Sequence, residues 1–87
     1  NFIVQARYIS FKMGDVQRLV HINTKINRLN EALEELKEDR RELASEMGSM
    51  VGEEFLEAFE ELGKIDSEIE HVKRERHRLE TLRDYIE

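Results

Sequence analysis

The chain has no cysteine, proline or tryptophan, and only four glycines among its 87 residues. Without cysteine it can form neither a disulfide nor a thiolate metal site. No apolar run approaches the roughly 20 residues that a membrane span needs, so we expect no membrane partner and, by default, a cytoplasmic protein. Phosphate-binding loops, nucleophile motifs and metal-finger spacings are also missing from the sequence. We therefore expect a protein that is not an enzyme and has no cofactor, no metal site and no small-molecule substrate.

What is present is a repeated apolar pattern in a chain of which 39% is charged. Apolar residues recur at alternating steps of three and four, the spacing of a coiled-coil seam, and a β-strand would require a period of two. The first run is Leu19, Ile22, Ile26, Leu29, Leu33, Leu36, Leu43, Met47 and Met50, and the second is Phe55, Ala58, Leu62, Ile65, Ile69, Val72 and Leu79.

Arg40 and Arg76 occupy seam positions within these two runs. We expect their aliphatic stems to pack on the seam while the charged heads reach solvent. The alternative is that they fix the register of the helices or limit the order of the oligomer, as polar seam residues do in other coiled coils.

Two glycines separate the runs, since the linking residues are Gly48-Ser-Met-Val-Gly52. Glycine readily adopts the left-handed conformation that ends a helix, and Asp15 is a plausible cap for the first helix. The sequence predicts helices over 15–47 and 53–86 with a turn at 48–52. Similar lengths and a short connection favour an all-α fold, an antiparallel two-helix coiled-coil hairpin over residues 14–87.

The register of this hairpin follows less directly from the pattern. We favour the pairing of Leu33 with Ile65, because it places Lys37 beside Asp66. A shift of one heptad would place Lys37 beside Lys73, an unfavourable contact. Such surface pairs contribute only a few tenths of a kcal/mol each, so both registers stay open.

Residues 1–13 are rich in β-branched and aromatic side chains. This composition favours a short extended segment, a strand or oligomerisation arm that pairs with the same strand of a second chain. The spacing of Phe2, Ala6, Ile9 and Met13 also fits a helix, which is the alternative.

Apolar residues outside the seam gather at the two ends of the predicted hairpin. A monomer would expose them as patches, and such patches mark interfaces. We therefore predict a homodimer that forms a four-helix bundle, or a higher oligomer; the alternative is that these residues only widen the contact within one hairpin. The predicted interface residues are Phe11, Met13, Val16, Val20, Leu56, Phe59, Leu82 and Tyr85, and Ala44 and Val51 also lie off the seam.

The net charge of −6 is distributed unevenly, since residues 31–70 carry fifteen acids and four bases. The leading hypothesis is a homo-oligomeric coiled-coil scaffold or adaptor. An alternative is an acidic inhibitor or regulator, of the kind that phages encode, which binds a basic or nucleic-acid-binding protein. That surface would comprise Glu34, Glu38, Glu57 and Glu60.

A second alternative is weak nucleic-acid binding through the basic run at Lys73, Arg74 and Arg78, because basic side chains can follow a phosphate backbone. Glu68 and His71 match the Glu-x-x-His spacing of carboxylate iron sites. They flank the seam instead of occupying it, so we expect a solvated charged face and no metal.

Overall fold

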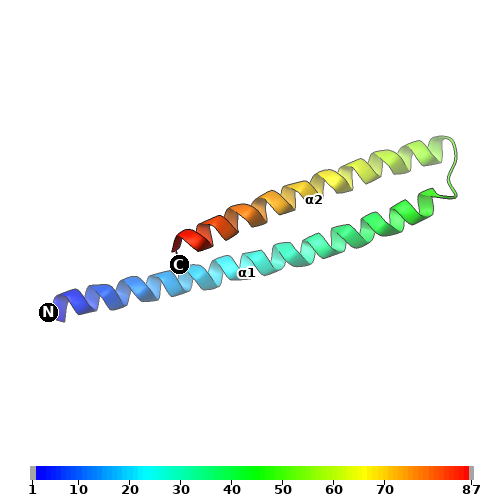
Figure 1. Cartoon of the computed structure of the whole chain (residues 1–87). Coiled ribbons are helices and arrows are strands. Elements are labelled where there is room, and N and C mark those ends of the chain that lie inside the picture. Colours follow the sequence, from blue (N-terminus) through cyan, green and yellow to red (C-terminus); the bar gives the residue numbers. More distant parts are fainter. Residues whose placement is uncertain (1, 87) are drawn as a thin grey trace.

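The structure is a computed structural model that describes the backbone of residues 2–86 and the side chains of residues 14–86. It contains two helices, α1 (Phe2–Met47) and α2 (Glu53–Ile86), which run antiparallel and side by side (Figure 1). No strand is present among the described residues. The predicted all-α hairpin is confirmed, and the limits of α2 are those predicted from the sequence.

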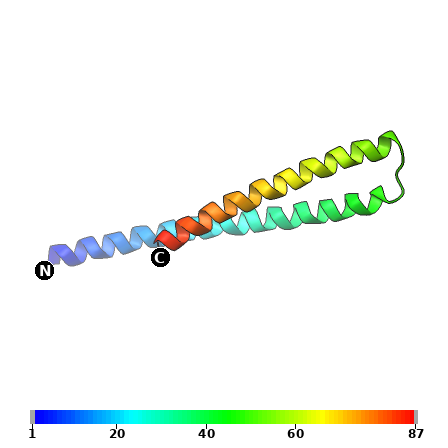
Figure 2. The same cartoon turned by 45° about the horizontal axis from the view of Figure 1, so that its top comes forward.

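The two helices wrap around each other along a rod of 76 × 14 × 13 Å. They lie side by side in Figure 1 but cross in Figure 2, which is turned by 45°. The blue N-terminal part of α1 continues past the end of α2, because α1 has 46 residues and α2 has 34. The first part of α1 therefore has no neighbouring helix from its own chain.

The core is the predicted seam. Its fully buried members all come from the two apolar runs, which confirms the heptad pattern, and the remaining seam residues are mostly half-buried. These buried residues are Ile22, Ile26, Leu33, Ala58, Ile69 and Leu79. A single seam of this kind is the packing expected of two helices that meet with heptad spacing.

The prediction of an extended segment at residues 1–13 is wrong, because α1 begins at Phe2. The hairpin offers no sheet edge with which a strand could pair, whereas a helix satisfies its own backbone hydrogen bonds. Asp15 is likewise not a helix cap, since it lies within α1 and is half-buried. The 3–4 spacing of the N-terminal apolar residues was the better guide than their β-propensity.

The turn uses its two glycines differently. Gly52 has a φ of +64° and its carbonyl accepts the first helical hydrogen bond of α2, from the amide of Leu56 at 3.2 Å. Gly48 is not left-handed; its amide donates to the Ser45 carbonyl at 3.4 Å, and Ser49 and Met50 make the next two bonds of the same short-range type. The end of α1 thus tightens into a 3₁₀-like turn.

The observed register differs from the favoured one. Three hydrogen bonds join the helices, and in each pair the two residue numbers add up to 106: Arg40–Asp66, Arg76–Asn30 and Arg83–Asn23. The pairing of Leu33 with Ile65 would add up to 98, so α2 is displaced by about one heptad.

Two contacts explain why the shifted register forms. Asp66, predicted to lie beside Lys37, instead pairs with the seam residue Arg40. The expected repulsion between Lys37 and Lys73 is offset within each helix, because Lys37 lies 4.0 Å from Glu34 and Lys73 lies 3.9 Å from Glu70. A one-heptad shift keeps both apolar runs in the seam, so such polar contacts decide between the registers.

The left-handed glycine leads to a first prediction. Gly52→Ala should lower the melting temperature by about 5 °C, since a left-handed alanine costs roughly 1–2 kcal/mol. Gly48→Ala is the matched control, because its Cβ would meet the Ser45 carbonyl oxygen at an ordinary 3.5 Å. Thermal unfolding followed by circular dichroism measures both variants, and equal melting temperatures would contradict the assignment.

The register gives a second prediction, which the absence of native cysteine makes easy to test. Ile26 and Leu79 belong to one core cluster, so Ile26→Cys with Leu79→Cys should form an intramolecular disulfide on mild oxidation. Ile26→Cys with Val72→Cys matches the other register and should stay reduced. Non-reducing electrophoresis of dilute protein distinguishes the two, and the reverse result would restore the register favoured from sequence.

Candidate functional site

Large exposed apolar side chains are confined to the two ends of the hairpin among the residues whose side chains are described. None lies between Val20 and Val51 on the first arm, or between Phe59 and Leu82 on the second. The exposed set is Val16, Val20, Val51, Phe55, Leu56, Phe59, Leu82 and Tyr85. It contains six of the eight residues predicted for the interface. The other two, Phe11 and Met13, have side chains outside the described part.

The tip patch lies at the turn and consists of Val51, Phe55, Leu56 and Phe59. Leu56 is 65% exposed and Phe59 is 62% exposed. The rings of Phe55 and Phe59 stack with centroids 6.4 Å apart and planes 22° apart. Phe55 was assigned to the seam from the sequence, but it remains partly exposed because it is the first seam position of α2 and lies beside the turn.

The base patch lies at the open end of the hairpin and consists of Val16, Val20, Leu82 and Tyr85. Val16 is 58% exposed and Val20 is 61% exposed. Both line a shallow hollow of about 440 Å³ on α1, together with Lys25 and Arg28. Every residue that lines this hollow belongs to α1, so no part of α2 covers it.

Heptad positions show which exposed residues share a side of the rod. With the seam at positions a and d, Asn23 and Asn30 of α1 and Asp66 of α2 fall at position e. All three bond to seam arginines of the opposite helix. The e positions of both helices therefore lie on one side of the hairpin, which we call the e flank.

Four exposed residues belong to the e flank. Val16 and Phe59 occupy position e, and Val20 and Leu56 occupy position b, which is next to e on a helix. Each end of the rod thus presents one e residue and one b residue on the same flank. Leu82 falls at position g, on the opposite flank, so the structure does not bring all the predicted interface residues onto one surface.

The seam arginines reach across to the other helix. Arg40 Nε donates to Asp66 Oδ1 at 2.6 Å, and Arg76 Nη1 donates to Asn30 Oδ1 at 2.9 Å. Arg76 Nε is buried without a hydrogen bond, and Glu80 Oε1 lies 3.7 Å from it. Because both heads have partners on the opposite helix, these contacts favour a role in register over simple exposure to solvent.

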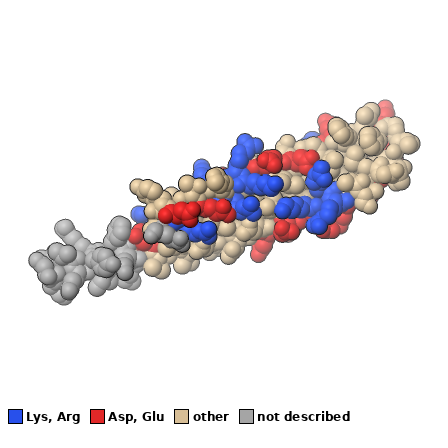
Figure 3. All heavy atoms as spheres, viewed as in Figure 1, with Lys and Arg blue, Asp and Glu red and all other residues tan. Residues whose placement is uncertain are grey.

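The predicted acidic surface divides into two parts. Glu38 pairs with Arg41 at 2.9 Å, and Glu34 lies near Lys37 on the same helix. Glu57 and Glu60 are exposed on α2 and make no ion pair with any described residue. On the face in Figure 3, acidic and basic side chains alternate along the middle, and the turn end is mainly uncharged with acids at its margin. Uncompensated acid is therefore greatest beside the tip patch.

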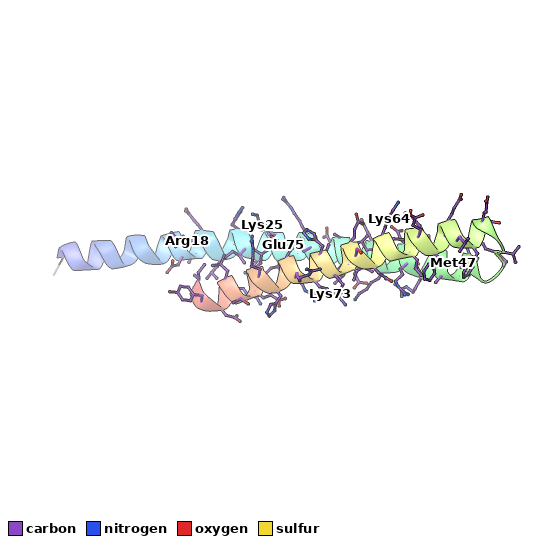
Figure 4. All side chains as sticks on the ribbon, turned by 90° about the horizontal axis from the view of Figure 1, so that it is seen from above. Arg18, Lys25, Met47, Lys64, Lys73 and Glu75 are labelled. Atoms are coloured by element: carbon purple, nitrogen blue, oxygen red, sulfur yellow. The ribbon has the colours of Figure 1, made fainter. Side chains whose placement is uncertain are left out.

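The predicted basic surface is partly neutralised by its own helix. Arg78 lies 3.2 Å from Glu75, and Lys73, labelled in Figure 4, lies near Glu70. Arg74 is exposed and makes no ion pair within residues 14–86. The two ion pairs reduce the positive charge that this run presents to a phosphate backbone.

Metal and membrane chemistry find no support in the described residues. No group of three His, Asp or Glu side chains is placed to hold a metal ion. Neither described helix combines enough length with enough apolar character to cross a bilayer.

Comparisons of the chain with models of protein families, with curated proteins and with solved structures found no match. The functional argument therefore depends on the exposed patches, the charges and the contacts described above.

The buried, unbonded Nε of Arg76 gives a third prediction. Arg76→Leu should raise stability by about 1 kcal/mol, because it removes an unsatisfied buried donor from the seam and adds apolar contact. Arg78→Leu is the matched control: the Arg78 side chain is 76% exposed, against 31% for Arg76. Urea unfolding measures both changes, and a loss of stability in Arg76→Leu would show that the cross-helix bond outweighs the unsatisfied donor.

Proposed function

We propose that this protein is a non-enzymatic assembly module, a homo-oligomeric coiled-coil scaffold or adaptor whose copies associate through the two ends of the hairpin. The observation that carries this proposal is the confinement of exposed large apolar residues to the tip and base patches. Single exposed apolar residues are common on proteins, whereas clusters at defined places mark interaction surfaces.

The surface area of the chain supports association. It amounts to 7192 Å² for 10.4 kDa, whereas a compact monomer of this mass would expose about 5400 Å². The excess is similar to the roughly 1,600 Å² of total surface buried in an ordinary protein–protein interface. A dimer would bring the exposed surface per chain closer to that of a compact protein.

The heptad positions of the patches suggest how a bundle would form. In a two-helix coiled coil only the a and d positions need to be apolar, whereas helices in larger bundles also bury e or g positions. Val16 and Phe59 at position e provide this wider apolar face at the two ends. We therefore favour a four-helix bundle made by two hairpins.

The two other hypotheses remain predictions. An acidic regulator would use Glu57 and Glu60, which have no ion-pair partner among the described residues. A nucleic-acid contact would depend on Arg74, since Lys73 and Arg78 have acidic neighbours on α2.

A fourth prediction tests the proposal at the tip. Leu56→Ser with Phe59→Ser should weaken self-association at least about tenfold, equivalent to 1.4 kcal/mol, because the substitutions remove apolar surface that only a second copy would bury. Both side chains are exposed in the hairpin, so helix content should be preserved. Sedimentation equilibrium measures the dissociation constant.

The matched control is Lys64→Ser with His71→Ser, which changes two exposed residues of the same helix outside both patches. Its association should equal that of the unmodified protein. A protein that sediments as a monomer at micromolar concentration before any substitution would overturn the proposed function.

A further inference from the structure

We propose that two hairpins pack side by side in opposite directions, with the tip patch of each copy on the base patch of the other. This inference rests on the proposed self-association and adds its surface and its polarity. The contact surface is the e flank, which carries Leu56 and Phe59 at one end and Val16 and Val20 at the other. A two-fold axis across the middle of the rod would make this contact twice.

The charge of the two halves determines the direction. The turn half, residues 34–71, carries fourteen acids and four bases, a net charge of −10. The base half, residues 14–33 with 72–86, carries five acids and eight bases, a net charge of +3. Packing in the same direction would place two strongly acidic halves side by side within a Debye length of each other, whereas opposite directions place each acidic half beside a basic one.

The patches are complementary at closer range as well. The base hollow that contains Val16 and Val20 is also lined by Lys25 and Arg28. Figure 4 labels Arg18 and Lys25 on this part of α1. On the tip, Leu56 and Phe59 alternate with the exposed carboxylates of Glu57 and Glu60. Each patch therefore combines an apolar centre with charge opposite to that of the other patch.

The geometry of the open end leaves room for a second copy. Arg83 bonds to Asn23, so the last residue of α2, Ile86, lies level with about residue 20 of α1. The backbone of α1 continues to Phe2 beyond that level without a neighbouring helix (Figure 1). The tip of a second hairpin would lie beside a part of α1 that no segment of its own chain covers.

Contact between two tips is the main competing arrangement, and the tip itself disfavours it. Leu56 and Phe59 lie along the flank of α2, and the first two turns of that helix also hold Glu53, Glu54, Glu57 and Glu60. Bringing two such ends together would place these carboxylates next to their own copies, where like charges repel.

Crosslinking of single-cysteine variants tests the direction, since the chain has no cysteine of its own. Ala44→Cys lies at an exposed e position near the tip, and Gln17→Cys lies in the base hollow. With a short bismaleimide, neither variant alone should form covalent dimers. Their equal mixture should do so, because about half of the dimers then contain one copy of each variant.

The outcomes separate this inference from the proposed function. Covalent dimers of Ala44→Cys alone, or a dimer that gives no crosslink in the mixture, would overturn the opposed arrangement and leave self-association intact. A monomer in sedimentation would overturn both. Covalent dimers in the mixture alone would support the opposed arrangement.

A charge reversal provides an independent measurement. Glu57→Lys with Glu60→Lys should weaken the dimer at low salt, because it puts positive charge at the tip opposite the basic base half. If the copies packed in the same direction or tip to tip, the same change would relieve repulsion and tighten the dimer. Sedimentation equilibrium gives the sign of the change, and a tighter dimer would overturn the proposal.

Discussion

The contact between the two apolar stripes along the a and d positions is the interaction on which the rest of the structure depends. Each helix has one such stripe, and each can bury it only against the other, because no further element exists in the described chain. Fully buried side chains are correspondingly few. Most of the stability of a helix in water comes from packing of this kind and not from intrinsic propensity. Residues outside the stripe are therefore left at the surface.

The same constraint explains where polar interactions matter. A seam made of aliphatic residues tolerates displacement by one heptad, since the same kinds of side chain meet again. Arg40 and Arg76 interrupt this equivalence, because each needs an acceptor on the opposite helix and finds one in Asp66 or Asn30. Each contact is modest in energy, yet together they distinguish two registers between which the apolar contacts alone differ little.

The proposed function follows from what the single seam leaves exposed. Apolar residues lie at both ends of the rod, and the two ends differ in charge. An apolar patch alone would give association without direction, and charge alone would give weak, screened attraction. Their combination on one flank supplies both affinity and polarity, which is what an assembly module requires.

The sequence by itself determined the helices, the position of the turn and the residues of the seam. These features depend on local spacing: 3–4 periodicity identifies a buried stripe, and two glycines between such runs interrupt it. It also identified Val16, Val20, Leu56 and Phe59 as residues outside the seam, since that follows from counting along one helix.

Only the tertiary structure decided the register, the course of the N-terminal segment and the sides of the rod. The register depends on Arg40 meeting Asp66, a contact between residues 26 positions apart that no local pattern encodes. The sorting of Val16 and Leu82 onto opposite flanks depends on how the two helices face each other. Local periodicity specifies which residues point inward on each helix, whereas the relative placement of two helices is a property of their contact.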